Sequence, residues 1–178
     1  MLVSYPTKQM YFNYPIFVIG YRDDQFGNNV TTCSSAYSLG DMYCFALSSE
    51  TNAAMQLLQS RRATINFLDR THLDMVEYAG SHPGTAKLED PRFAHETIAS
   101  LPVLTSAFAA LILKIDATQV YHGYVNFTAR IEQRLVDDAA LTGGQFDPEA
   151  IVPVGFAGDK GAKVYRVPGE VLRPGNFA

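Results

Sequence analysis

The sequence has no tryptophan and only two cysteines, and it lacks the excess of positive charge typical of nucleic-acid-binding proteins. Cys33 and Cys44 have no metal-ligand spacing and are too few for a disulfide framework, which favours a reducing compartment. The formal net charge of −4 argues against binding to a phosphate backbone. No targeting segment is recognised, and the apolar run FAALIL, residues 108–113, is far too short to span a bilayer. We therefore expect a cytoplasmic protein that binds neither nucleic acid nor membrane.

The common catalytic signatures are also missing from the sequence. None of the four histidines has HExxH spacing, so we predict no metal site. The serines lack a GxSxG setting and neither cysteine has an adjacent histidine, which gives little support to nucleophilic catalysis. No GxGxxG motif opens a βαβ unit, which argues against a Rossmann dinucleotide site.

The chain is long enough, at 178 residues, for one domain with a substantial core, and we expect a single domain over residues 1–178. Its 10 tyrosines and 11 phenylalanines often stand beside Val, Ile and Thr, as is typical of β-sheets. The segment 141–178 is rich in Gly and Pro, so we expect a strand or two set among loops there, reaching toward a partner subunit.

Strands dominate the predicted secondary structure. Alternating or continuous apolar patterns predict strands at 14–23, 30–38, 42–48, 63–68, twice within 108–135, and at 163–167. Helical spacing predicts one helix that Ser49 or Thr51 caps and a second over 72–80, whereas SHPGTAKLEDPRF is predicted as loop or broken helix. Short connections between the first three strands imply antiparallel pairing. Because no regular βαβ alternation occurs, the pattern favours a closed or nearly closed antiparallel barrel over a doubly wound sheet.

The stretch GNNVTTCSSAYS, residues 27–38, is a predicted strand with unusually small side chains. Alternation places Thr32 and Ser34 on one face and Cys33 on the other. One interpretation is that a flat ligand lies close to the backbone of this strand, where main-chain N–H groups reach its polar edge. The other is that bulky neighbours leave room only for small side chains.

The junction FALSSET, residues 45–51, leads from a strand into the first predicted helix. Its hydroxyls and the free N–H groups of the helix N-terminus could hold a phosphate, or the segment could be an ordinary helix cap. Lys87, in GTAKLED, has two similar interpretations: a phosphate or ribose contact, or a solvated lysine in a loop.

Four stretches together resemble the flavin reductase-like family of FMN-binding split barrels. They are YPIFVIGYRDDQFGNNVTTCSSAYSLGD, FALSSETNAAMQLLQSRRATINFL, VYHGYVNFTARI and KVYRVPGE, and the similarity covers roughly residues 10–168. The resemblance implies a mainly β fold, an antiparallel split β-barrel of Greek-key type with a few inserted helices. It also implies a homodimer with the flavin near the subunit interface.

The resemblance also implies roles for individual residues. Thr32, Cys33 and Ser34 match the segment that lines the flavin ring. Ser48, Ser49 and Thr51 match the hydroxyls around the phosphate. The remaining matches are Asn66 after the helix, His122 in the hairpin near the nicotinamide or flavin ring, and Lys87, although the aromatic that often follows it is Leu88 here.

A flavin reductase would bind FMN, or alternatively FAD, and pass hydride from NAD(P)H to it, so that the cofactor performs the chemistry. We expect His122 to orient nicotinamide or move a proton, unless it is an ordinary surface histidine. Reduced flavin could then serve a partner monooxygenase. Two other hypotheses remain open: a non-catalytic FMN-binding electron carrier or sensor, and a small barrel that binds another ligand altogether.

Overall fold

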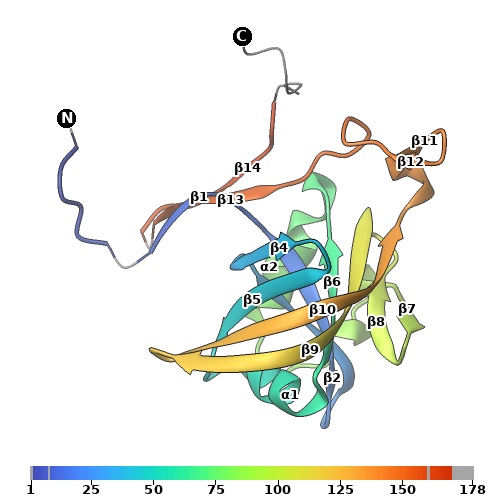
Figure 1. Cartoon of the computed structure of the whole chain (residues 1–178), viewed down its shortest axis with the longest axis horizontal. Coiled ribbons are helices and arrows are strands. Elements are labelled where there is room, and N and C mark those ends of the chain that lie inside the picture. The colour runs from blue at the N-terminus through green and yellow to red at the C-terminus, as the bar shows by residue number, and fades with distance from the viewer. Residues whose placement is uncertain (1, 8, 160, 170–178) are drawn as a thin grey trace.

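The computed structural model of the chain describes residues 2–7, 9–159 and 161–169, and most of its regular structure is β-strand (Figure 1). Seven strands form one antiparallel sheet in the order β3-β2-β6-β9-β10-β5-β4. Their bounds are β2 (Phe17–Asp23), β3 (Gly27–Cys33), β4 (Ala36–Leu39), β5 (Met42–Ser48), β6 (Arg62–Phe67), β9 (Ala109–Tyr121) and β10 (Tyr124–Val136). The predicted mainly β, antiparallel fold is confirmed.

The sheet curls into a barrel because its two edge strands are neighbours in the sequence. Only Ser34 and Ser35 separate the end of β3 from the start of β4, yet these strands stand at opposite edges. The backbone N–H of Ala46 donates to the carbonyl of Ser35 at 3.0 Å, beside the end of β3. The barrel is therefore split at Ser34 and Ser35. The continuous strand predicted over 30–38 was wrong at this point, because the chain leaves one edge of the sheet and joins the other.

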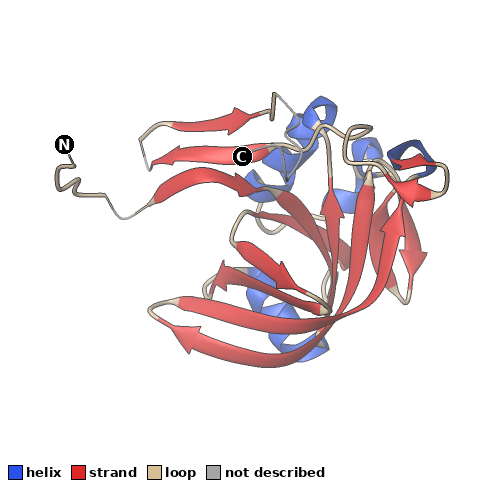
Figure 2. Ribbon diagram, turned by 45° about the horizontal axis from the view of Figure 1, so that its top comes forward, coloured by secondary structure: helices blue, strands red, loops and turns tan. Residues whose placement is uncertain are grey.

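Three smaller sheets accompany the barrel. The strands β1 (Met10–Pro15), β13 (Gly155–Asp159) and β14 (Lys163–Arg166) form an antiparallel sheet that projects beyond the barrel (Figure 2). The other two sheets are the hairpin of β7 (His95–Ile98) with β8 (Leu101–Leu104), and the two-residue strands β11 (Leu141–Thr142) and β12 (Gln145–Phe146).

The helices are insertions between strands, as predicted. Helix α1 (Asn52–Ser60) begins at the N-cap Thr51, whose hydroxyl accepts a hydrogen bond from the N–H of Ala54, and it ends at Arg61 in a left-handed conformation. Helix α2 (Leu73–Ser81) lies one residue away from its predicted range of 72–80. The other helical segments of the described residues are 3₁₀ helices: η1 (Arg70–His72), η2 (Lys87–Glu89), η3 (Pro91–Phe93) and η4 (Asp138–Ala140).

Strand β2 explains why the chain forms two hydrophobic clusters. Phe17 and Ile19 point into the barrel, where they pack with Phe127, whereas Val18 points outward and packs with Val76 of α2. All three β2 side chains are fully buried, so this strand reads as a continuous apolar run rather than an alternating one. Helix α2 thus covers one outer face of the barrel beside β3.

The predicted elements agree with the structure in most of the barrel, but six strands have no predicted range of their own: β1, β7, β8, β11, β12 and β13. In the Gly/Pro-rich segment 141–178, the described part holds β11 to β14, and residues 170–178 lie outside the described residues. Within the described part of the chain, no helix is long and apolar enough to cross a membrane.

Candidate functional site

A cavity of about 650 Å³ opens where the split of the barrel, helix α2 and the β1-β13-β14 sheet meet. Its volume lies in the range of small-molecule and cofactor sites. Its walls come from six parts of the chain, the fifth of which is Tyr124 alone. They are Tyr11 and Ile16; Thr32, Cys33, Ser34 and Ser35; Ala46, Leu47, Ser48 and Thr51; Val76, Glu77, Gly80 and Ser81; Tyr124; and Phe156, Lys163 and Tyr165. We call it the split cavity.

The first wall is the end of β3, where the sequence has unusually small side chains. Thr32 packs against α2: its hydroxyl donates to the carbonyl of Val76, and a Cβ added to Gly80 would lie 3.2 Å from the Cβ of Thr32. Thr32 thus limits the α2 residue that faces it, because a side chain at position 80 would crowd Thr32. Beyond it, Ser34 and Ser35 face the cavity.

Cys33 closes the split from inside the barrel. Its sulfur lies 3.3 Å from the carbonyl oxygen of Ala46 on β5, where no strand ladder joins β3 to β5. Burial raises the pKa of the Cys33 thiol to about 11, so it is protonated and poorly nucleophilic at neutral pH. The residue therefore contributes shape and a weak hydrogen bond to the cavity rather than covalent chemistry.

The second wall is the junction between β5 and α1. Ser48 and Thr51 both line the cavity, and Thr51 caps the helix while its hydroxyl donates to the carbonyl of Ser48 at 2.8 Å. The backbone N–H groups of Asn52 and Ala53 have no partner among the hydrogen bonds of the described residues. A nine-residue helix that presents free N–H groups and the positive end of its dipole can bind an anion.

The third wall belongs to the β1-β13-β14 sheet, which the sequence analysis missed in part. Tyr11 of β1 packs against Phe156 of β13, with ring centroids 5.0 Å apart. Strand β14 adds Lys163, the one cation that lines the cavity within the described ranges, and Tyr165. Burial raises the pKa of Tyr165 above its ordinary value, and the carboxylate of Glu77 raises it further. Lys163 and Tyr165 lie in the stretch KVYRVPGE, which resembles the family, whereas Tyr11 was missed; the alternating aromatics of MYFNYP were its signal.

Two of the predicted flavin contacts lie away from the split cavity. Asn66 is fully buried: its amide nitrogen donates to the carbonyl of Val18, and its amide oxygen accepts from the N–H of Leu104. Lys87 is also buried, with its ammonium group donating to the carbonyl of Val30 at 2.8 Å. Burial lowers the pKa of Lys87 to about 8. Both side chains join β-strands to their neighbours, and neither lines the cavity.

Ser49 and His122 lie next to the split cavity without lining it. His122 is exposed at the tip of the β9-β10 hairpin, where its ring meets the ring of Tyr121 edge to face. Ser49 binds the same hairpin tip through the carbonyl of Gly123. The structure therefore brings together Thr32, Cys33, Ser34, Ser48 and Thr51 of the predicted set, and it places Ser49 and His122 at the margin.

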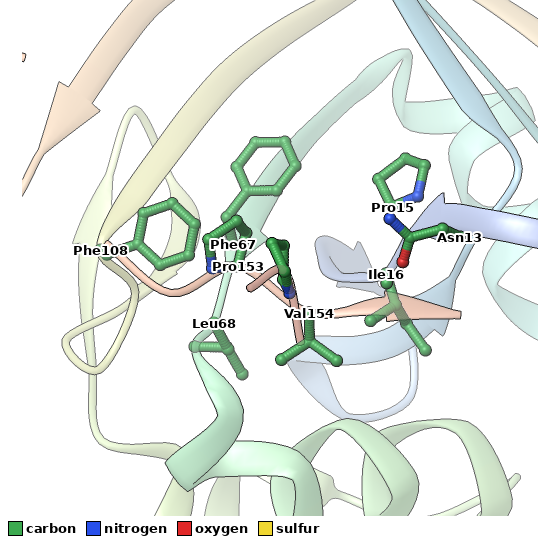
Figure 3. Close-up of a pocket in the computed structure, with 10 residues that line it drawn as sticks. Asn13, Pro15, Ile16, Phe67, Leu68, Phe108, Pro153 and Val154 are labelled. Atoms are coloured by element: carbon green, nitrogen blue, oxygen red, sulfur yellow. The ribbon is translucent and has the colours of Figure 1, made fainter. Parts of the chain in front are cut away.

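A smaller cavity of about 240 Å³ shares Ile16 with the split cavity (Figure 3). Phe67, Phe108 and Leu68 form one side of it, and the lining contains no charged side chain within the described residues. An anionic group would find no counter-charge there. The split cavity, which combines hydroxyls, free N–H groups and a lysine, is the better candidate for a phosphorylated ligand.

Comparisons with known proteins agree with this geometry. The model of the flavin reductase like domain family matches residues 10–151. No curated protein matches the chain. Three similar solved structures are flavoredoxin of Desulfovibrio vulgaris, an FMN-binding protein of Thermus thermophilus and the styrene monooxygenase flavin reductase of Pseudomonas putida S12.

The likeness to these structures extends over nearly the whole chain. For flavoredoxin the identity is 22% and the TM-score 0.86, covering 100% of this chain and 99% of that one. For the FMN-binding protein the values are 21% and 0.78, with 98% and 97% covered. For the styrene monooxygenase reductase they are 18% and 0.72, with 91% and 95% covered. At these identities the structural likeness establishes the fold, and the family model establishes the relationship.

Proposed function

Because the chain belongs to the flavin reductase like domain family, we propose that it binds FMN in the split cavity and reduces flavin with NAD(P)H. The observation that carries the proposal is one continuous cavity with two chemically different ends. One end has the small side chains of Thr32, Cys33 and Ser34, and the other has the N-terminus of α1 with the free N–H groups of Asn52 and Ala53. A flat ring fits against the small side chains of the first end, and a phosphate fits at the helix N-terminus of the second.

The phosphate end has the donor set that an FMN phosphate requires. The N–H groups of Asn52 and Ala53 and the hydroxyl of Ser48 are its donors, together with the positive end of the α1 dipole, while Thr51 caps the helix and fixes this end. Lys163 adds a positive charge from the small sheet, where its ammonium nitrogen lies 5.9 Å from the centroid of the Phe156 ring. Riboflavin would leave these groups without an anionic partner, and FAD would have to place its adenosine outside this cavity. FMN is therefore the flavin that we propose.

The ring end fits a planar, largely apolar group with polar edges. Thr32, Cys33 and Ser34 form a wall with little bulk, while Tyr11 and Phe156 supply aromatic surface from the small sheet. The Cys33 thiol stays neutral, so it introduces no charge beside the ring. Residues of this kind bind and orient a ring and exclude water from it.

A bound flavin would itself supply the hydride-accepting chemistry, so the protein needs no strongly activated side chain. The cavity walls position the ring, and the nicotinamide nucleotide must approach from the open side of the cavity. We propose that His122, at the exposed hairpin tip beside the cavity-lining Tyr124, orients the nicotinamide or moves a proton.

The proposed partners follow from the same site. Met10, Phe12, Tyr14 and Val164 remain exposed on the small sheet. A second copy of the chain could cover them, so we propose a homodimer, which light scattering of the purified protein would test. A partner monooxygenase is a further proposal, supported by the similarity to a reductase of that kind.

Reconstitution and turnover test the function. We expect the purified protein to take up FMN and to oxidise NADH or NADPH only when flavin is present. Tight FMN binding with negligible turnover on both nicotinamide nucleotides would instead identify an electron carrier or sensor. Absence of flavin absorbance after reconstitution would contradict both functions and leave the barrel with another ligand.

A further inference from the structure

The tip of the β9-β10 hairpin is a two-residue turn with an unusual residue in it. Tyr121 and Tyr124 face each other across the turn, and His122 and Gly123 have φ angles of 48° and 81°. Two left-handed residues in succession form the tight turn that matches the twist of a hairpin. Glycine adopts this conformation freely, but histidine does so at a cost, so the turn needs support from outside the hairpin.

Ser49 provides that support. Its backbone N–H and its hydroxyl both donate to the carbonyl of Gly123, at 2.9 Å and 3.0 Å. The two donors of one residue thus converge on a single acceptor at the hairpin tip. The hydroxyl proton of Ser49 is committed to this bond and is not free for a phosphate oxygen.

The tether has a consequence for the split cavity through the next residue of the hairpin. Tyr124 lines the cavity together with Ser48 and Thr51, and it pairs in register with Ser48. Its side chain is 51% exposed, so packing alone does not fix it. Ser49 itself does not line the cavity. The β5-β10 ladder ends at the pair of Tyr124 with Ser48, and the bonds from Ser49 to Gly123 extend this connection to the hairpin tip, next to Tyr124 and the α1 junction.

We propose that Ser49 is a positioning residue that holds Tyr124 at the wall of the split cavity, and that it does not contact the flavin phosphate. This inference rests on the proposed function for the identity of the ligand, but the tether itself is a property of the ligand-free protein. It separates Ser49, whose hydroxyl bonds to the hairpin tip, from Thr51, whose hydroxyl bonds stay within the junction and cap α1. Tyr124 accordingly becomes a wall of the flavin site.

Binding of two flavins to matched variants distinguishes the roles. Ser49→Ala keeps the backbone donor and loses the hydroxyl, and we expect it to weaken FMN and riboflavin by the same factor, roughly 2- to 10-fold. Ser49→Thr keeps a hydroxyl and should restore both affinities. Thr51→Ala, the control in the same junction, should weaken FMN selectively. Selective loss of FMN in Ser49→Ala would overturn the proposal.

Spectra of the ligand-free protein keep the two hypotheses separate. In ¹H–¹⁵N NMR, Ser49→Ala should shift the amide signals of Gly123 and Tyr124 and speed their hydrogen exchange, whereas Thr51→Ala should leave them in place. Unchanged hairpin signals in Ser49→Ala would overturn the positioning role. If the unmodified protein binds neither flavin, the proposed function fails, and these spectra still decide whether Ser49 positions Tyr124.

Discussion

The hydroxyl of Thr32 donates a hydrogen bond to the carbonyl of Val76, and this bond fastens helix α2 to strand β3 at the wall of the split cavity. Gly80, one turn further along α2, allows the close approach, because a Cβ there would lie 3.2 Å from the Cβ of Thr32. The small side chains of β3 thus serve two purposes. Thr32 packs against helix α2, and the small side chains of Ser34 and Ser35 leave room for the cavity.

Thr32→Val should lower the melting temperature by about 2–4 °C, because it removes one partly buried hydrogen bond, worth about 1 kcal/mol, with little change in shape. Thermal unfolding followed by circular dichroism measures the change. The matched control is Thr97→Val on β7, an exposed position whose hydroxyl bonds to no described residue. Equal melting temperatures for the two variants would contradict the role given to Thr32.

Asn66→Leu should destabilise the protein by on the order of 3 kcal/mol, because it leaves the buried N–H of Leu104 without a partner and removes the side-chain bond to the carbonyl of Val18. Urea unfolding measures this loss. Because Asn66 does not line the split cavity, the ratio of FMN to riboflavin affinity should stay unchanged in the folded fraction. A variant of normal stability with a selective loss of FMN would make Asn66 a flavin contact after all.

Lys87 should make stability depend on pH. Burial lowers its pKa to about 8 from 10.5, so between these values the unfolded chain binds more protons than the folded chain. The contribution of Lys87 to the free energy of unfolding therefore rises with pH between about 8 and 10.5, by at most about 1.4 kcal/mol per pH unit. Below pH 8 the buried ammonium group is charged, and its desolvation lowers the free energy of unfolding by the full amount.

Lys87→Met removes the titrating group and keeps most of the side-chain length. The difference in unfolding free energy between the wild type and Lys87→Met should rise between pH 8 and 10, in favour of the wild type, and should be flat from pH 6 to 7.5. Urea unfolding at several pH values measures it. A difference that stays constant over the whole range would mean that Lys87 titrates normally.

His122 can be tested with two substitutions that separate its ring from its backbone. Asparagine tolerates the left-handed conformation, so His122→Asn removes the imidazole and keeps the turn, whereas His122→Ala also strains the turn. If the ring assists the reaction, both variants should lose NADH or NADPH oxidation by 10-fold or more, with FMN affinity kept in His122→Asn. Full activity in His122→Asn would reduce His122 to a surface residue in a turn.

The sequence predicted secondary structure best where the determining interactions lie within a few residues along the chain. Continuous apolar character predicted β2 because both of its faces are buried, and Thr51 predicted the start of α1 because a cap acts within three residues. The split at Ser34 and Ser35 could not be predicted in this way. It follows from closure of the sheet, which depends on strands far apart in the chain.

The missed wall of the cavity has a similar explanation. Strand β1 ends in a proline and carries a bulge at Asn13, whose φ of 63° breaks the regular alternation. Its partner β13 contains two glycines, and Gly155 is required because the Asn13 side chain occupies the place of a Cβ there. The alternating aromatics of MYFNYP indicate a strand at Tyr11, but its pairing with β13, which brings Tyr11 and Phe156 together, does not follow from a local pattern.

The measurement that tests the account most directly is a parallel titration of FMN and riboflavin into the wild type and Thr51→Ala, followed by flavin fluorescence. If the phosphate lies at the N-terminus of α1, the wild type should bind FMN more tightly than riboflavin. Thr51→Ala should then weaken FMN by about 5-fold or more and riboflavin by less than about 2-fold. Equal loss for both flavins would remove Thr51 from the phosphate site, and no binding of either by the wild type would contradict a flavin site in this cavity.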